Sequence, residues 1–465
     1  MEKLLHNINR RQFLKTLGGT AATLATATAL GAKNPFAEEG EQQGGMTYRT
    51  SGKGDRVSLL GYGCMRWPMI KNEKGEDIID QEAVNQLVDY ALAHGVNYFD
   101  TAPRYLQGLS EEATANALQR HPRDSYYIAT KMTNTNDYSR KAAMDMYRQS
   151  FKRLKVDYID YYLLHTIGGT RRDLTAQEVF DKRFIENGML DFLMKEREAG
   201  RIRHLGFSFH GQDDGFDYFL SYHDKVHWDF VQIQMNYVDW KHHSDSKNRR
   251  PQSDASYMYE RLTALGIPVV IMEPLLGGQL ASLNDHLTTE MLSREPSRSI
   301  ASWAFRYCGT YPNVMTVLSG MTYMENLVDN LSSFAPLKPL TDEEVAWLEN
   351  EVAEEFDSFP IIMCTACQYC MPCPYGLDIP GIFAHYNKCV NEGAVNRDRG
   401  SKEYRKARRK FLVGYDRSID RLRQADQCIG CGHCTPHCPQ GIRIPARMRE
   451  IDEYTEFLRS DISPL

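Results

Sequence analysis

Eight short apolar segments recur between residues 57 and 334, and the stretches between them have the periodicity of amphipathic helices. Strands that alternate with helices over about 280 residues are typical of a parallel sheet with helical crossovers. Eight such units predict a closed (β/α)8 barrel rather than an open sheet. The predicted strands are residues 58–63, 97–100, 126–131, 159–164, 203–207, 230–235, 268–272 and 314–318.

The helical stretches carry end signals as well as periodicity. Residues 81–94 place Val84 and Val88 on one apolar face, and Gly95 suits the helix end. Ser110 is predicted to be the N-cap of the next helix, ahead of first-turn acids. No Gly-x-Gly-x-x-Gly motif joins a strand to a helix, so the pattern does not favour a Rossmann domain. Further helices are predicted at residues 138–154 and 323–331.

Polar side chains end three successive predicted strands. Asp100 ends the second strand, Lys131 the third and His165 the fourth, and Tyr105 follows Asp100 within the same loop. Because the C-terminal ends of barrel strands surround one mouth, we expect these four side chains to converge there. Taken singly, a strand-end Asp is usually a helix cap and a lone His usually a core residue. Together they indicate an active site.

The four residue types suit the reduction of a carbonyl. Such a reaction develops alkoxide charge, and Tyr105 is a natural proton donor, although a free phenol has a pKa of about 10. A neighbouring Lys131 ammonium is predicted to lower that pKa, and Asp100 to hold the lysine in place. His165 is predicted to orient the substrate oxygen by a hydrogen bond.

These residues, with the segment Phe99-Asp100-Thr101-Ala102, give residues 46–337 a resemblance to the aldo/keto reductase family. The resemblance implies that Asp100, Tyr105, Lys131 and His165 form the catalytic tetrad. It also implies an NADPH molecule extended across the barrel mouth, with its phosphates on two glycine-containing loops and the N-terminus of the last barrel helix. Ordinary barrel packing is the alternative interpretation of both loops. The residues implied to bind the nucleotide are Ser208, Gln232, Met272, Pro274, Leu275, Gly277, Ser319, Gly320, Met321 and Asn330.

Some positions depart from the family pattern. Phe209 stands where the family has a carboxamide-binding asparagine, and Met272 where an aromatic stacks on the nicotinamide. Gly320 and Asn326 stand where a Lys/Arg pair often grips the 2′-phosphate. The cofactor is therefore left as NADP(H) or NAD(H).

Two longer loops, residues 166–187 and 239–253, leave the same predicted face and are expected to shape the substrate pocket. Arg104, Trp67 and His210 are candidates to line it. An arginine beside Tyr105 suggests an acidic substrate, with a surface salt bridge as the alternative.

Eight of the eleven cysteines lie in two groups between residues 364 and 438. They form two runs, Cys-x2-Cys-x2-Cys-x2-Cys-Pro and Cys-x2-Cys-x2-Cys-x3-Cys-Pro, and the second is the bacterial ferredoxin pattern. Because the fourth cysteine of such a run ligates the other cluster, two [4Fe–4S] clusters with crossed ligation are predicted. One set is Cys364, Cys367, Cys370 and Cys438; the other is Cys428, Cys431, Cys434 and Cys373.

The first run is one residue short before its fourth cysteine, and a zinc ribbon is the competing interpretation. Residues 371–380 resemble the hallmark of an aldo/keto reductase subfamily with a C-terminal 4Fe-4S domain. Helices at 342–356, 382–390 and 402–423 predict a linker helix and a small α-helical ferredoxin-like domain over residues 338–465. The basic stretch 402–423 is a docking face for an acidic electron carrier, a solvated face or a face that packs against an acidic neighbour.

The N-terminus contains Arg10-Arg11 followed by a weakly apolar stretch at residues 16–32, which resembles a twin-arginine export signal. Residues 1–45 are accordingly predicted to be signal and linker, with the export machinery as a partner and the periplasm as the destination. The stretch is too short for a stable membrane anchor. A net charge of −6 gives no reason to expect nucleic-acid binding.

The sequence therefore predicts an exported oxidoreductase that interconverts a small carbonyl and an alcohol by nicotinamide hydride transfer. The alternative is an iron–sulfur electron-transfer protein whose barrel is a non-catalytic scaffold. Nicotinamide transfers two electrons as hydride, whereas a [4Fe–4S] cluster accepts one. The clusters are therefore either structural or linked to the barrel by a further carrier.

Overall fold

The computed structural model describes residues 45–169, 174–244 and 252–461. The predicted export signal and most of its linker lie outside the described residues, as do parts of the loops predicted at 166–187 and 239–253. The described residues pack as one unit. No helix within the described ranges has the length and apolarity needed to cross a bilayer.

The eight predicted strands form a closed parallel barrel, which confirms the predicted fold class. Going round the barrel, the strands follow the order β10, β11, β12, β3, β6, β7, β8, β9. Pairing of β12 with β3, with Val317 opposite Leu60, closes the ring. The strands are β3 (Leu60–Gly63), β6 (Tyr98–Asp100), β7 (Tyr127–Met132), β8 (Ile159–Ile167), β9 (Ile202–Phe209), β10 (Phe230–Gln234), β11 (Val269–Met272) and β12 (Val314–Ser319).

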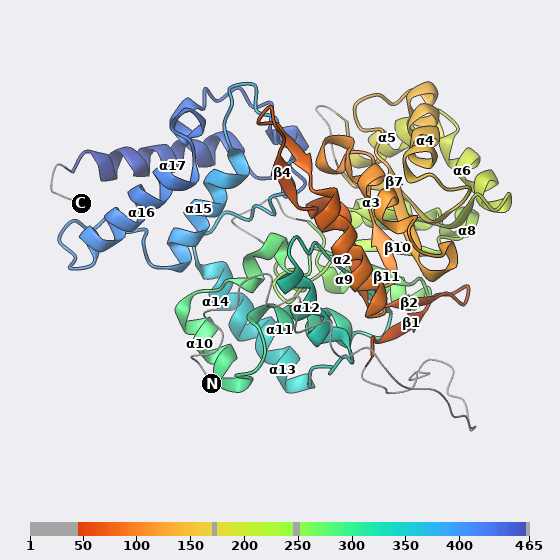
Figure 1. Cartoon of the computed structure of the whole chain (residues 1–465), viewed down its shortest axis with the longest axis horizontal. Helices are drawn as coiled ribbons and strands as arrows, with labels where there is room; N and C mark the ends of the chain where they lie inside the picture. Colours follow the sequence, from red (N-terminus) through yellow and green to blue (C-terminus); the bar gives the residue numbers. More distant parts are fainter. Residues whose placement is uncertain (1–44, 170–173, 245–251, 462–465) are drawn as a thin grey trace. The chain divides into compact units, whose positions relative to one another are not determined.

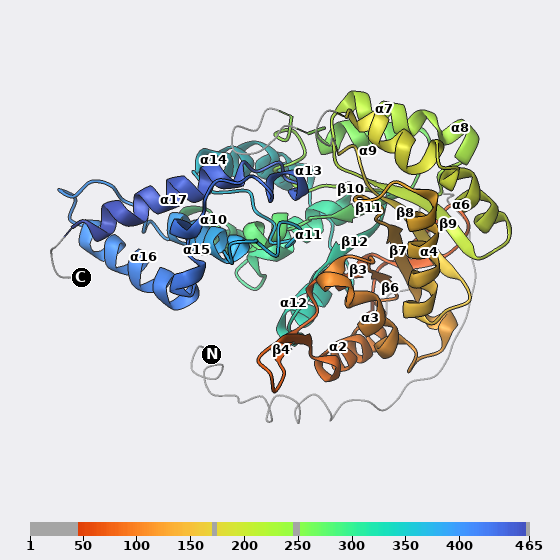
Figure 2. The ribbon, with the colours of Figure 1, turned by 90° about the horizontal axis from the view of Figure 1, so that it is seen from above.

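Helices surround the barrel and cover its outer face (Figure 2). Two short antiparallel hairpins interrupt the start of the barrel. The hairpin β1–β2 (Tyr48–Thr50, Arg56–Ser58) precedes β3, and the hairpin β4–β5 (Met69–Lys71, Asp77–Ile79) lies between β3 and the first helix in the chain. The helices of this part are α2 (Gln81–Ala93), α3 (Ser110–Leu118), α4 (Arg140–Leu154), α5 (Ala176–Phe180), α6 (Met189–Glu198), α7 (Asp213–Ser221), α8 (His223–Val226), α9 (Ala255–Ala264), α10 (Asp285–Arg294), α11 (Ile300–Thr310) and α12 (Met324–Phe334).

The prediction that Ser110 is the N-cap of α3 is wrong. Leu109 occupies the cap position, and the Ser110 hydroxyl donates to the carbonyl oxygen of Cys64 at 2.7 Å. Glu111 is buried and accepts a hydrogen bond from the Thr130 hydroxyl at 2.7 Å. The start of α3 packs against the loop after β3, so tertiary contacts override the local capping signal.

The chain after the barrel is helical, as predicted. A linker helix runs through α13 (Asp342–Trp347), a π-helical segment (Leu348–Val352) and α14 (Ala353–Ser358). Three further helices, α15 (Ile379–Asn391), α16 (Tyr404–Ser418) and α17 (Ile444–Arg459), lie side by side (Figures 1 and 2). Their shared core, which includes Phe383, Phe411 and Met448, is separate from the barrel core.

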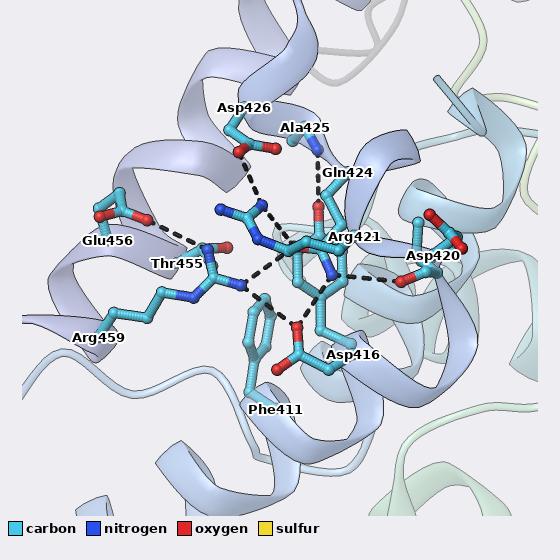
Figure 3. Close-up of polar contacts among 12 residues, drawn as sticks. Phe411, Asp416, Asp420, Arg421, Gln424, Ala425, Asp426, Thr455, Glu456 and Arg459 are labelled. Atoms are coloured by element: carbon cyan, nitrogen blue, oxygen red, sulfur yellow. Dashed lines mark hydrogen bonds and ion pairs between the residues drawn. The ribbon is translucent and has the colours of Figure 1, made fainter. Parts of the chain in front are cut away.

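A polar network fixes the segment that leads into the second cysteine run (Figure 3). Arg421 donates to Asp426 at 2.7 Å, and Arg459 of α17 donates to Gln424 at 3.0 Å. Gln424 in turn donates to Asp416 of α16 at 2.9 Å. Because exposed ion pairs contribute little stability, we assign this network a positional role ahead of Cys428.

The basic stretch that ends at residue 423 is only partly a solvated face. The helix within it ends at Ser418, five residues before the predicted end. Arg408 is buried and donates to the carbonyl oxygen of Leu458 at 2.8 Å, and Lys410 pairs with Glu392 at 3.0 Å.

Candidate functional site

The ends of β6 and β7 bring a lysine and an aspartate together beneath the barrel mouth. The Lys131 ammonium donates to the Asp100 carboxylate at 2.5 Å and to the Thr101 carbonyl oxygen at 2.9 Å. The two charged side chains are 0% and 3% exposed, respectively. The pair is therefore a buried ion pair whose cation lies directly under the mouth.

Tyr105 lies above this pair, at the start of the loop turn Tyr105–Gly108. Its ring centre is 4.8 Å from the Lys131 nitrogen and 6.0 Å from the ring centre of His165, which it meets edge-on. Tyr105 is 8% exposed, and its hydroxyl makes no hydrogen bond within the described part of the chain. The four residues predicted to converge lie within one cluster.

The electrostatics of Tyr105 differ from the prediction. Burial raises the pKa of Tyr105 well above its usual range, and the nearby Asp100 adds to the increase. The predicted lowering by Lys131 is not found, because the ammonium is paired with Asp100 and its own pKa is lowered by burial. Tyr105 therefore keeps its proton at neutral pH, as a proton donor requires.

His165 is held neutral and in a defined orientation. Burial, followed by the charges of Lys131 and Arg183, keeps the pKa of His165 well below its usual value. Its Nδ1 lies 2.6 Å from the Thr133 hydroxyl, and its carbonyl oxygen accepts from Arg183 at 2.7 Å. Either atom of this contact can be the donor; the tautomer in which the Thr133 hydroxyl donates to Nδ1 has its ring proton on Nε2.

Sequence reasoning missed Thr133 and Arg183. Thr133 follows Lys131 by two residues, and side chains two residues apart in an extended chain point to the same side. This spacing could have indicated that Thr133 lies on the same side as Lys131. Arg183 belongs to a π-helical segment, Asp181–Ile185, far from any strand end, and no local signal marks it.

The residues predicted to hold the nicotinamide end of a nucleotide lie at strand ends around the mouth. Ser208 is buried at the end of β9 and accepts from the Thr166 amide at 2.9 Å. Gln232 is buried in β10, and its side-chain oxygen has no hydrogen-bond partner among the described residues. Met272 is half-buried at the end of β11. The unpaired oxygen of Gln232 suits an amide donor.

The first loop predicted to hold phosphates contains Pro274, Leu275 and Gly277, and it is packed against the cysteine-rich part of the chain. A methyl group on Gly277 would lie 2.2 Å from the Cα atom of Thr365. Gln279 in the same loop donates to the Cys364 carbonyl oxygen at 3.1 Å. Residues 364–365 therefore fill the space over this loop.

The second loop predicted to hold phosphates, residues 319–321, also makes contacts within the protein. A methyl group on Gly320 would lie 2.7 Å from the side chain of Arg66. Arg66 also donates to the Thr365 carbonyl oxygen. Asn330 donates to the Ser319 hydroxyl at 2.8 Å, and the carbonyl oxygen of buried Met321 accepts from Tyr62.

The three candidate pocket residues have different surroundings. Arg104 donates to the Thr135 hydroxyl at 2.8 Å and lies 6.0 Å from the ring centre of Tyr369. His210 has an Nδ1 with no hydrogen-bond partner within the described ranges, and burial lowers its pKa to about 4. Trp67 is 2% exposed and donates to Thr114 at 3.0 Å, so it belongs to the core.

The structure brings together the four cysteines of the first predicted group and three of the second. Cys364, Cys367, Cys370 and Cys438 line one small apolar cavity, together with side chains such as Phe383. Burial, then the neighbouring thiols Cys367, Cys364 and Cys438, raise the pKa of Cys370. Burial is also the main cause of the raised pKa of Cys434, to which Cys428 and Cys373 add. In each group, therefore, the neighbouring thiols come from both cysteine runs.

The donor chemistry of both groups fits an iron–sulfur cluster, which is held by four thiolates. Among the residues that the structure describes, no three His, Cys, Asp or Glu side chains gather around a point suited to a single metal ion.

Crossed ligation can be tested with single cysteine variants. We expect Cys438→Ser and Cys364→Ser to perturb the same cluster signal, although the two residues belong to different runs. Cys373→Ser and Cys428→Ser are expected to perturb the other signal. Electron paramagnetic resonance of the dithionite-reduced variants measures this. Pairing of Cys373 with Cys364 in the spectra would contradict it.

Three family models match the chain. Residues 59–352 match the aldo/keto reductase family, residues 363–442 a 4Fe-4S dicluster domain, and residues 7–27 a twin-arginine translocation pathway signal sequence.

Individual proteins match over most of their length. An uncharacterized oxidoreductase, YqkF of Bacillus subtilis, is 26% identical over 325 residues, covering 64% of this chain and 94% of that protein. L-galactose dehydrogenase of Arabidopsis thaliana is 24% identical, covering 65% and 92%. Among solved structures, an aldo-keto reductase from Klebsiella pneumoniae in complex with NADPH is 20% identical, covering 68% and 98%, with a TM-score of 0.49.

Proposed function

The chain belongs to the aldo/keto reductase family, and on that premise we propose that its barrel interconverts a carbonyl and an alcohol at Tyr105. It is an oxidoreductase, and a 4Fe-4S dicluster domain follows the barrel in the chain. The observation that carries the proposal is the buried Lys131–Asp100 pair directly beneath a protonated phenol.

Each tetrad residue has a part in the proton chemistry. As electrons reach the carbonyl carbon, charge develops on its oxygen, and the Tyr105 hydroxyl donates a proton to that oxygen. The Lys131 ammonium stabilises the phenolate that remains, and Asp100 keeps the ammonium charged and in position. Neutral His165 donates from Nε2 to the same oxygen, which orients the carbonyl before the proton moves.

The two cofactor predictions fit the residues differently. Two [4Fe–4S] clusters suit the two four-cysteine groups, and such a cluster supplies one-electron transfer when bound. A nicotinamide nucleotide is implied by the family, and the unpaired oxygen of Gln232 suits its carboxamide. A dinucleotide extended across the mouth does not fit the phosphate loops as they are packed, because residues 364–365 and Arg66 occupy them.

We further propose that residues 1–45 are signal and linker, 46–337 the barrel domain and 338–465 the linker helix with the ferredoxin-type domain. The twin-arginine signal matched at residues 7–27 supports export by that route, and we propose the periplasm as the destination. Small carbonyl compounds and a redox protein are the proposed partners.

The carbonyl chemistry can be tested on the anaerobically purified holoprotein. We expect it to reduce members of a panel of aldehydes and ketones when supplied with NADPH or a chemical one-electron donor. Chromatography of the alcohol products measures this. Absence of any alcohol product with either donor would count against the proposal.

The low pKa of His165 makes a separate prediction about pH. A histidine with a pKa well below about 6.5 stays neutral across the neutral range. We therefore expect kcat/KM for carbonyl reduction to show no histidine inflection between about pH 6 and pH 8. Thr133→Val removes the hydroxyl that fixes the ring, and we expect kcat to fall in that variant. A wild-type inflection near pH 6.5 that disappears in His165→Gln would contradict this role.

A further inference from the structure

Two cysteine-bearing segments, one from each run, are fixed to the barrel mouth. The first is held at residues 364–365 by hydrogen bonds from Gln279 and Arg66. The second is held at residues 439–440, where Gln252 donates to the Pro439 carbonyl oxygen at 3.0 Å and Gln440 donates to Gln234 of β10 at 3.0 Å. Both segments that supply the first cysteine group therefore contact the barrel mouth. That group is Cys364, Cys367, Cys370 and Cys438.

Tyr369 joins this group to the catalytic cluster. It stands between Cys367 and Cys370 in the chain, so its backbone belongs to the cluster-binding segment. Its ring centre is 6.5 Å from that of His165, which it meets edge-on, and 6.0 Å from the Arg104 guanidinium. The side chain thus extends from the cluster-binding segment to the place where the carbonyl oxygen would be bound.

We propose that electrons enter the barrel site one at a time, from the cluster held by Cys364, Cys367, Cys370 and Cys438 past Tyr369, and that the substrate is a conjugated dicarbonyl. This inference rests on the proposed carbonyl chemistry of Tyr105 and names its electron source and substrate class. The packing of Thr365 on Gly277 is the reason that a bound dinucleotide is not that source.

The substrate class follows from the electron count. A cluster delivers one electron, so the substrate must pass through an odd-electron stage, which an isolated ketone cannot stabilise and a conjugated dicarbonyl delocalises. The dicarbonyl takes up two electrons and two protons and becomes an enediol. Each of the two reduced clusters loses one electron. Tyr105 supplies one proton and water the other, and a low-potential one-electron donor protein reduces the clusters again.

The second cysteine group has the exposure expected of an entry point. Cys431 is exposed, whereas the four cysteines of the first group are only partly exposed. In this route, electrons from outside enter at the second cluster and pass from it to the first.

The test uses the anaerobically purified holoprotein, reduced with dithionite and freed of the excess by gel filtration. Butanedione is the conjugated probe and cyclohexanone the isolated-ketone control. Stopped-flow absorbance follows cluster oxidation after mixing. We expect a fast oxidation with butanedione, none with cyclohexanone, and acetoin as the product. Tyr105→Phe is expected to abolish the fast phase, which separates the barrel reaction from direct oxidation at the exposed cluster.

A matched pair of variants tests the route. Tyr369→Leu is expected to lose the fast phase, while Tyr369→Phe keeps the ring and keeps the phase. Paramagnetic resonance of both reduced variants must show two intact clusters. NADPH fluorescence titration of the wild-type protein is expected to show no binding at concentrations that saturate typical reductases.

The outcomes separate this inference from the proposed function. Tight NADPH binding with Tyr105-dependent reduction of cyclohexanone would overturn the cluster route and leave the carbonyl chemistry standing. A fast phase that survives in Tyr105→Phe would overturn both. Equal rates in Tyr369→Leu and Tyr369→Phe would overturn the path past Tyr369.

Discussion

Replacing Tyr105 by phenylalanine is expected to lower kcat for carbonyl reduction by about 10²- to 10⁴-fold, the usual contribution of a positioned general acid. The variant keeps the ring that packs edge-on against His165 and over Lys131. It removes the one hydroxyl in the cluster that burial keeps protonated and that has no partner within the described residues. Steady-state rates at a fixed donor concentration measure the effect.

Tyr98→Phe is a matched control for this variant. Tyr98 lies in β6, the strand that ends at Asp100, and its buried hydroxyl also has no hydrogen-bond partner in the part of the chain that the structure describes. Because it lies among the core residues inside the barrel, its loss is expected to leave kcat unchanged. Unchanged turnover in Tyr105→Phe would favour the alternative in which the barrel is a scaffold for an electron-transfer domain.

Replacing Lys131 by methionine is expected to destabilise the fold by about 3–5 kcal/mol, because the variant leaves the Asp100 carboxylate buried without its cation. The free energy of unfolding, measured with urea on the cluster-loaded protein, gives the size of the effect. The same variant is expected to lose carbonyl reduction, since the phenolate of Tyr105 would have no counter-charge.

The double variant Lys131→Met, Asp100→Asn separates stability from activity. Removing both charges removes the uncompensated carboxylate, so much of the lost stability is expected to return while activity stays low. Lys141→Met is the surface control, because its pair with Asp145 is exposed and its loss should not be measurable. Full stability in the single variant Lys131→Met would show that the pair is not ionised in the folded protein.

The sequence was sufficient to predict the barrel because each strand is buried on both faces and therefore reads as an apolar run. The start of α3 was misread at Ser110 because a contact with the Cys64 carbonyl oxygen competes with local capping. The same limitation applies to Tyr105. Its neighbours were predicted, but the sign of its pKa shift depends on burial and on the pairing of Lys131 with Asp100.

The contacts of the phosphate loops could not be predicted from the sequence. Gly277 and Thr365 are separated by a long stretch of chain, and each lies in a motif with its own local explanation. Their contact depends on how two separate cores pack together, which leaves no periodic or compositional trace. The grouping of the cysteines can be predicted from the sequence, because the crossed pattern follows from the spacing of the ferredoxin motif.

The contact between Thr365 and Gly277 also has a consequence for how the protein matures. The backbone of the first cysteine run must take its final shape before it can close over the loop after β11. Without iron these buried cysteines are neutral thiols with a raised pKa and lack the metal bonds that would fix the backbone of the run. An iron-free chain is therefore expected to leave that loop uncovered and the barrel unfinished. Iron insertion is then a checkpoint in biogenesis, completed in the compartment where the clusters are made and before the finished molecule leaves it.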